Sequence, residues 1–268
     1  MFTRHNRPVL RLLQSVPRRT YNITMSRVQS HDENIGIAAA RHHGLRELFD
    51  EFGLDYYCEG SLSLDEAVAG AGLELRVVRS RMERLSAADA GPNWPEEPLS
   101  ALIEHLEMDE HGTARTLMFR AALLFGDVCR SGGDERLANM RTIFRGLCTS
   151  LVVHMEHEEH TIFPAIVSLE EAWIRGEEPP PLADGGLRAA AARFAQEHGD
   201  IARALATLRR ERIAVEANAP PVVRLFEQLE QFERSIHEAM NLENYVAFPR
   251  GIALEDALMH STPALSPA

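Results

Sequence analysis

The chain has 268 residues, a formal net charge of −12 and 45% hydrophobic residues. The negative charge argues against nucleic acid as a main partner, and no apolar run approaches the length of a membrane span. The three cysteines include no Cys-x-x-Cys pair, which is typical of a reducing compartment and not of a disulfide framework. We therefore expect a cytoplasmic protein without a membrane partner, in which abundant Ala, Leu, Glu and Arg favour helices.

The first 29 residues are expected to form a basic, disordered tail. Residues 1–25 carry five arginines and no acidic residue. A targeting segment and an upstream start codon, with Met25 as the true start, are the two alternatives. A dispensable tail is favoured over targeting because the segment lacks the continuous apolar stretch of a secretory signal.

Residues 30–86 are expected to form a small helical domain. A helical pattern covers residues 34–52, and the turn Asp55-Tyr56-Tyr57-Cys58-Glu59-Gly60 follows it. Ser63, with Glu66 three residues later, has the pattern of a capping box at the start of the next helix. A third helix completes this domain.

A proline-rich linker over residues 87–98 leads to a second, larger helical region over residues 99–250. Its four long helical patterns cover residues 99–130, 134–171, 187–218 and 222–248. Their mostly short connections predict an all-α, up-down four-helix bundle, followed by a C-terminal tail over residues 251–268. Pro164 is expected to bend or break the second helix of this bundle.

One motif occurs twice in the bundle, with one residue missing from the second copy. In each copy a glutamate, Glu158 or Glu243, precedes a Phe-Pro pair by five residues. His154 lies four residues before Glu158 on the same helical face, whereas Ala239 occupies the equivalent position before Glu243. Histidine and glutamate at this spacing on an apolar stripe are how a helix bundle offers two ligands to one metal centre. The motif therefore predicts a metal site, and the alanine leaves its completeness open.

Each of the four predicted helices places at least one histidine or glutamate on its apolar stripe. On the first helix, Met108 is expected to lie on the same stripe. The polar residues on these stripes are His111, His154, Glu158, His198 and Glu243. A lone histidine on an apolar face is usually a satisfied core residue. Three histidines and two carboxylates in one core are costly unless they are paired or coordinated, and such mixed ligands suit iron, manganese or zinc.

Two further residues bear on the missing ligand at Ala239. Glu107 lies four residues before His111, so it either reaches solvent from the edge of the stripe or replaces the missing ligand. His237 has mostly polar helical neighbours and is expected on the polar face, where it would be a poor substitute.

At these residues the chain resembles the hemerythrin-like di-iron proteins, and specifically the family of iron–sulfur cluster repair proteins (RIC, repair of iron centres). The resemblance covers about residues 30–250. In the small domain it rests on the block over residues 49–60 and on Ser63-Leu64-Asp65-Glu66-Ala67. In the bundle it rests on Pro98-Leu99-Ser100, on Ile103-Glu104-His105 with His111, and on the two Phe-Pro motifs.

The resemblance implies a centre of two non-haem irons, or of one iron if the missing histidine disrupts it. The implied terminal ligands are His111, His154 and His198, and the implied bridging carboxylates are Glu158 and Glu243. An oxo or hydroxo bridge would complete the centre. The family's fourth histidine falls at Ala239, and of its two adjacent cysteines only Cys58 remains, as a single redox thiol beside Tyr57.

The function that the resemblance implies is defence against nitrosative and oxidative stress. Damaged iron–sulfur proteins would be the clients, and repair would proceed by iron donation or by chemistry with NO or O2. Two alternatives stay open: a sensor module that binds O2 or NO, and a degenerate bundle whose metal site is incomplete. Whether the protein is an enzyme, and whether it forms a homodimer, stays open as well.

Overall fold

The computed structural model describes residues 34–85, 91–130, 135–182, 185–216 and 219–261. The basic segment over residues 1–29 lies outside them. The described part of the chain is helical, and its β-type pairing is one isolated bridge between Asn34 and Ser63. None of its helices combines the length and the apolar character that crossing a lipid bilayer requires.

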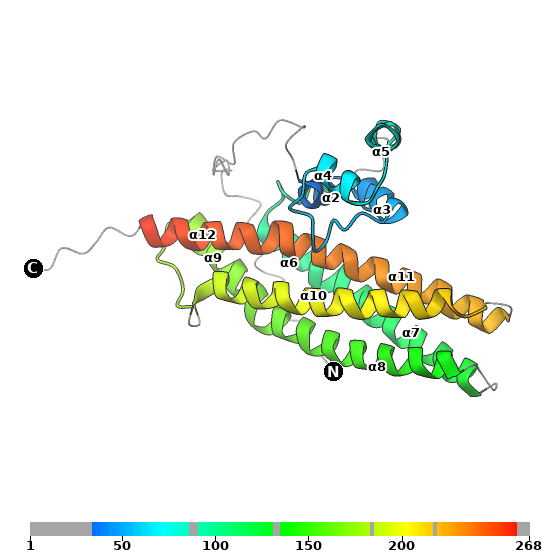
Figure 1. Ribbon diagram of the computed structural model, residues 1–268. Coiled ribbons are helices and arrows are strands. Elements are labelled where there is room, and N and C mark those ends of the chain that lie inside the picture. Colours follow the sequence, from blue (N-terminus) through cyan, green and yellow to red (C-terminus); the bar gives the residue numbers. More distant parts are fainter. Residues whose placement is uncertain (1–33, 86–90, 131–134, 183–184, 217–218, 262–268) are drawn as a thin grey trace, which may run out of the picture. The chain divides into compact units, whose positions relative to one another are not determined.

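The small domain consists of the short helices α2 (Ile35–Arg41), α3 (His43–Phe52), α4 (Leu64–Gly70) and α5 (Leu75–Met82) (Figure 1). The helix expected over residues 34–52 is interrupted at His42, whose backbone is extended. Gly53 ends α3 in the left-handed region with φ of 66°, where glycine is favoured. Ser63 and Glu66 form the predicted capping box at the start of α4.

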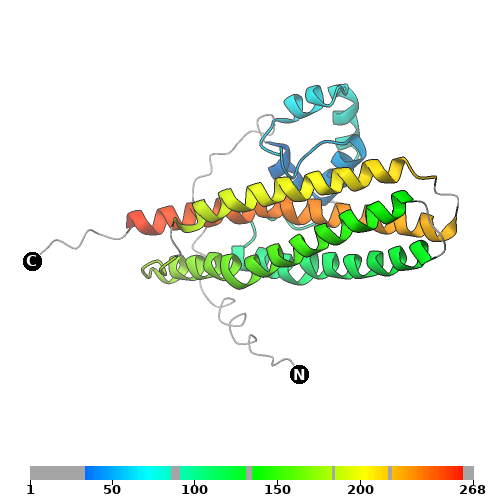
Figure 2. The same ribbon diagram turned by 60° about the horizontal axis from the view of Figure 1, so that its bottom comes forward.

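The bundle is built from four long helical rods that lie side by side (Figures 1 and 2). Three of the rods contain a π-helical turn, labelled η. In chain order their elements are α6 (Leu99–His105), η3 (Leu106–Glu110), α7 (His111–Arg130), α8 (Glu135–His157), η4 (Glu158–Ile162), α9 (Phe163–Arg175), α10 (Gly186–Ile213), α11 (Pro220–Leu242), η5 (Glu243–Ala247) and α12 (Phe248–Ser261). The last helix, α12, continues to Ser261, past the bundle end expected at residue 250.

The π turns η4 and η5 lie directly before the two Phe-Pro pairs. Phe163 donates its backbone N–H to the carbonyl of Glu158, and Phe248 donates to that of Glu243. These bonds span five residues, as in a π-helix. Because proline lacks an N–H and crowds the preceding turn, the wider turn lets the helix continue past Pro164. Of the expected bend or break at Pro164, the break does not occur, because the helix continues from η4 into α9 with a changed winding.

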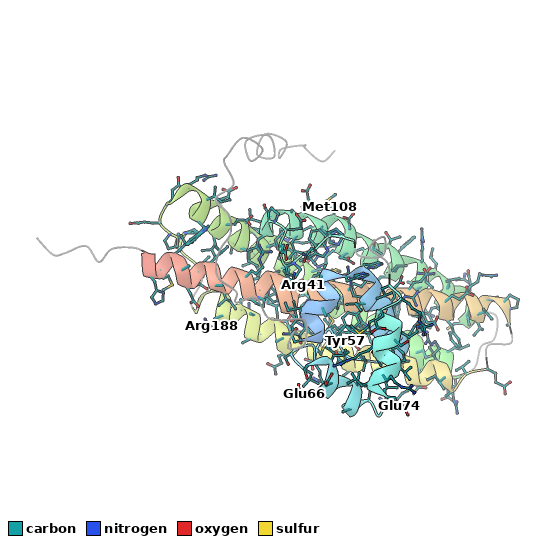
Figure 3. All side chains as sticks on the ribbon, turned by 90° about the horizontal axis from the view of Figure 1, so that it is seen from above. Arg41, Tyr57, Glu66, Glu74, Met108 and Arg188 are labelled. Atoms are coloured by element: carbon teal, nitrogen blue, oxygen red, sulfur yellow. The ribbon has the colours of Figure 1, made fainter. Side chains whose placement is uncertain are left out.

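The π turn η3 is not followed by a proline, but it too changes which side chains face the interior of the bundle. A π turn holds more residues than an α turn, so a 3.6-residue period no longer predicts which residues face inward. Met108, expected on the interior stripe, lies within η3 and is 70% exposed. Figure 3 shows it at the periphery of the bundle. That expectation was wrong because the sequence pattern gave no sign of the π turn.

The apolar core of the bundle is divided into two clusters. One contains residues of α7, α8, α10 and α11, including Phe125, Phe144 and Phe232. The other contains residues of α6, α9, η5 and α12, including Phe163 and Val246. His111, Glu158 and His198 each fall along the chain between a member of one cluster and a member of the other. A polar layer therefore separates the two apolar regions.

The small domain contacts the bundle at α11 and η5. Asn241 donates to the backbone carbonyls of Gly36 and Tyr56 at 3.0 Å each. Gly36 and Gly60 both lie so close to the ring of Tyr245 that a Cβ atom at either position would be 2.5 or 2.7 Å from a ring carbon. Glycine is therefore required at both positions for this contact.

His237 lies beneath the small domain and not on a polar face. Its side chain is 3% exposed, and its ring stacks on that of Tyr57 with 3.6 Å between centroids. Nδ1 lies 3.4 Å from a carboxylate oxygen of Asp50. The expectation of a polar face was wrong because the small domain covers this part of α11, which helical neighbours alone do not reveal.

The start of the bundle is held by a carboxylate from a distant segment. Glu170 accepts hydrogen bonds from the backbone N–H groups of Leu99 and Ser100, at 2.7 and 2.8 Å. Helix N-termini leave such groups without partners. We expect Glu170→Ala to lower the free energy of unfolding by about 1–3 kcal/mol in urea denaturation. Glu171→Ala is the matched control, since its ion pair with Arg175 contributes at most about 1 kcal/mol; equal losses for both variants would contradict this role.

Candidate metal centre

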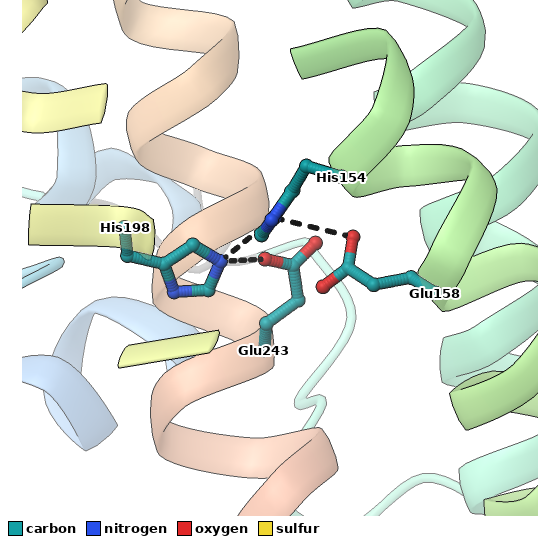
Figure 4. Close-up of side chains that lie close together, drawn as sticks. All are labelled: His154, Glu158, His198 and Glu243. Carbon is teal, nitrogen blue, oxygen red and sulfur yellow. Dashed lines mark hydrogen bonds and ion pairs between the residues drawn. The ribbon is translucent and has the colours of Figure 1, made fainter. Parts of the chain in front are cut away.

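Four buried side chains from four helical segments converge in the polar layer. His154 of α8, Glu158 of η4, His198 of α10 and Glu243 of η5 each offer one donor atom, and these atoms lie within 4.8 Å of one another (Figure 4). The exposed fraction of these residues is 6% for His154 and 1% or less for the others. Such a group is compact enough to surround a single cation.

His111 of α7 approaches the same carboxylates from another side. Its Nε2 lies 3.4 Å from Oε1 of Glu243 and 3.5 Å from Oε2 of Glu158. Oε2 of Glu243 lies 3.1 Å from Nε2 of His198, and Oε2 of Glu158 lies 3.4 Å from Nε2 of His154. Each carboxylate is therefore shared between His111 and one other histidine. Glu243 presents a different oxygen to each histidine, whereas Glu158 presents the same oxygen to both.

The Nδ1 atom of each of the three histidines is held from outside the centre. The partners are Glu159 for His111 at 2.8 Å, Glu197 for His154 at 2.8 Å, and the side-chain oxygen of Asn244 for His198 at 2.9 Å. In a neutral imidazole, an oxygen acceptor at Nδ1 means that this nitrogen carries the proton, so the lone pair is on Nε2. All three Nε2 atoms face the interior, and such outer hydrogen bonds are typical of histidines that bind metals.

Two features of the centre fit a cation and are costly without one. Nε2 of His154 lies 3.0 Å from Nε2 of His198, which brings two lone pairs together. Both carboxylate oxygens of the fully buried Glu158 lack a hydrogen-bond partner. A buried carboxylate without such partners is expensive, and a cation between these groups would satisfy both the lone pairs and the carboxylate.

The two carboxylates have opposite electrostatic environments. Burial raises the pKa of Glu158 well above its usual value, and the charge of Glu243 acts in the same direction. Burial acts on Glu243 in the same sense, but the adjacent imidazoles of His111 and His198 outweigh it and hold its pKa well below its usual value. Burial and the neighbouring His198 lower the pKa of His154 to about 4, so this ring stays neutral and able to bind a metal at neutral pH.

The centre is asymmetric. On one side His154 and His198 face both carboxylates, whereas on the other side His111 is the one histidine that the described residues provide. Ala239, where the resemblance places a further histidine, is buried, and the backbone N–H of Glu243 donates to its carbonyl. Position 239 therefore lies one α-helical turn before Glu243.

Glu107 is not brought into the converging group. It is half-buried within η3, and its side chain is not among those whose donor atoms lie together. The structure thus gives no support to Glu107 as the replacement ligand.

Cys58 does not have the environment of a reactive thiol. Burial raises the pKa of Cys58 to about 12, and the nearby Asp55 and Glu59 add to the effect. Reactive cysteines have lowered pKa values, because the thiolate is the nucleophile. In this conformation the side chain packs against the apolar core of the bundle, which disfavours the expected role as a redox thiol.

Sequence reasoning missed the residues that support the histidines, namely Glu159, Glu197 and Asn244. Each is adjacent in sequence to a predicted ligand, and that adjacency is the signal that could have found them. Glu159 is itself held by Arg115 through two bonds of 2.8 and 2.9 Å. These contacts join different helices, so the spacing within one helix does not reveal them.

Comparisons with known proteins agree with a cation site in this bundle. Residues 102–250 match the family described as hemerythrin HHE cation binding domain. The iron–sulfur cluster repair protein ScdA of Staphylococcus haemolyticus is 24% identical over 208 residues, which cover 75% of this chain and 90% of that protein. The iron–sulfur cluster repair protein YtfE is 22% identical over 231 residues in an Escherichia coli strain (O17:K52:H18) and 24% identical over 234 residues in Citrobacter koseri. Both alignments cover 84% of this chain and 98% of the relative.

Proposed function

Because the chain belongs to the hemerythrin HHE cation-binding family, we propose that its polar layer binds non-haem iron and that the protein supports the repair of damaged iron–sulfur clusters. The proposed ligands are His111, His154, Glu158, His198 and Glu243. The names of the relatives ScdA and YtfE support the repair function. The observation that carries the metal site is the set of three Nε2 atoms aimed at two shared carboxylates, one of them without hydrogen-bond partners.

The asymmetric ligand set suggests how the site would serve as an iron donor. We infer one firmly held iron between His154, His198 and the two carboxylates, and a second, more weakly held iron on the side of His111. An oxo or hydroxo bridge between the irons belongs to the same proposal. Weak binding on the side of Ala239 suits release of iron to a client protein, in a reducing cytoplasmic compartment.

The residues of the chain perform three tasks in this proposal. The carboxylates of Glu158 and Glu243 supply negative charge from two helices, and the outer hydrogen bonds keep each imidazole in the tautomer that binds a metal. The two apolar clusters on either side of the layer keep bulk water away from it. Bound iron would supply redox chemistry and a coordination position for a small molecule such as NO or O2.

Repair can be tested with a protein whose [4Fe–4S] cluster has lost iron. We expect the iron-loaded protein to restore the absorbance of that cluster, with a matching loss of iron from the donor. Glu243→Ala, which removes a shared carboxylate, should give no more recovery than the same total concentration of free ferrous iron. Equal recovery with the metal-free protein would contradict a donor function.

Glu107→Ala is expected to leave the iron content unchanged. Glu107 is half-buried and lies outside the converging group, so its loss removes no ligand. Elemental analysis of the desalted variant beside His111→Ala makes the comparison. A loss of iron in Glu107→Ala as large as in His111→Ala would show that Glu107 binds iron after all.

A further inference from the structure

One side chain connects the proposed centre to the small domain. The Oδ1 atom of Asn244 accepts the hydrogen bond from Nδ1 of His198 at 2.9 Å. Its Nδ2 atom donates to the backbone carbonyl of Tyr57 at 2.8 Å. Tyr57, labelled in Figure 3, belongs to the turn that joins α3 to α4. Its ring stacks on that of His237 in α11.

These two bonds together fix the tautomer of His198. A backbone carbonyl can only accept, so the NH2 group of Asn244 must face Tyr57 and its oxygen must face His198. An oxygen at Nδ1 requires the proton on that nitrogen and leaves the lone pair of Nε2 toward Glu243. The backbone of the small domain thus determines which tautomer of His198 the centre contains.

The same turn is held by two neighbours of Asn244. Asn241 donates to the carbonyl of Tyr56 at 3.0 Å, and the hydroxyl of Tyr245 donates to the carbonyl of Cys58 at 2.9 Å. Asn244, which donates to the carbonyl of Tyr57, also accepts a hydrogen bond from His198 of the centre. The side chain of Asn244 therefore links the position of the His198 ring to the docking of the turn.

We propose that Asn244 is a positioning residue that couples cation binding at His198 to the docking of the turn over residues 54–60. This coupling rests on the proposed metal site. A cation at Nε2 of His198 holds the ring in place, which strengthens the bond to Asn244 and hence the bond to Tyr57. Coupling between two sites is reciprocal, so a docked turn also strengthens cation binding.

The alkylation rate of Cys58 reports on the docking of the turn. Its side chain is half-buried against the bundle core, so opening of the turn speeds its reaction with N-ethylmaleimide. The rate is followed by mass spectrometry of the Cys58 peptide, with and without stoichiometric ferrous iron under anaerobic conditions, and iron content is measured in parallel. We expect iron to slow alkylation in the native chain on the order of tenfold. The Cys148 peptide of α8 is the internal control.

Two variants separate coupling from simple loosening. Asn244→Asp keeps an acceptor for His198 but removes the donor to Tyr57, so it should retain iron while alkylation of Cys58 no longer responds to iron. Tyr245→Phe removes the hydrogen bond from the Tyr245 hydroxyl to the carbonyl of Cys58, and this bond does not involve His198. It should speed alkylation with and without iron and keep the ratio of the two rates.

The outcomes distinguish this coupling from the site on which it rests. Iron bound by the native chain with no effect on Cys58 would overturn the coupling and leave the metal site intact. An undiminished response to iron in Asn244→Asp would overturn the role of Asn244. A native chain that binds no iron would overturn the metal site and the coupling together.

Discussion

Replacing Glu158 by methionine is expected to abolish iron binding and to stabilise the metal-free protein by about 1–4 kcal/mol. The side chain of Glu158 is fully buried, and neither of its oxygens has a hydrogen-bond partner. Methionine has a similar volume and needs no such partner. Urea denaturation in the presence of a chelator measures the gain, and elemental analysis measures the loss of iron.

The gain in stability should depend on pH in a defined direction. Folding raises the pKa of Glu158 from about 4.5, so rising pH favours the unfolded chain, where this carboxyl ionises more easily. The advantage of Glu158→Met is therefore present at neutral pH and fades as the pH falls through about 4.5, because well below that pH the carboxyl is protonated in both states.

The adjacent Glu159 provides a control with the opposite sign. It is bonded to Arg115 and to His111, and these contacts outweigh burial and lower its pKa. Glu159→Met should therefore lower the stability of the metal-free protein. If Glu158→Met were also less stable than the native chain at pH 7, Glu158 would not be the uncompensated carboxylate that we describe.

Replacing Ala239 by histidine is expected to raise the firmly bound iron from about one to about two per chain. Position 239 is one helical turn before Glu243 and is buried. The carboxylates already lie beside His111 on this side of the centre, so one added imidazole supplies the ligand that is missing. Iron content after desalting makes the measurement.

Ala239→Leu is the matched control for this gain, because it fills similar space without offering a ligand. Both variants enlarge a buried side chain, which costs about 1–3 kcal/mol, and thermal unfolding of each metal-free protein shows whether it stays folded. A folded Ala239→His protein that retains no more iron than the native chain would show that this side of the centre cannot hold a second iron.

Much of the bundle and of the centre could be predicted because both depend on local spacing. His154 and Glu158 lie four residues apart on an apolar stripe, and such a pair faces the interior whatever the neighbouring helices are. The capping box of Ser63 and Glu66 is local in the same way. The structure brings five of the six predicted metal ligands together, and the sixth, Glu107, lies in the π turn η3.

The features that the sequence did not reveal depend on contacts between distant segments or on changes of helical winding. An α-helical period puts Met108 on the interior stripe, but η3 interrupts that period. The helical neighbours of His237 indicate a polar face, but the small domain that covers it is more than one hundred residues away in sequence. The bond from Asn244 to Tyr57 spans 187 residues, so spacing along one helix carries no information about it.

Iron content per chain is the most direct measurement of the central claim. The native protein is loaded with ferrous iron under anaerobic conditions, desalted without chelator and analysed by elemental analysis beside Glu158→Met. The predicted result is about one firmly held iron per native chain, a second one that appears only in excess iron, and none in the variant. A native chain that retains no iron, or a variant that retains as much as the native chain, would contradict the assignment of the metal centre.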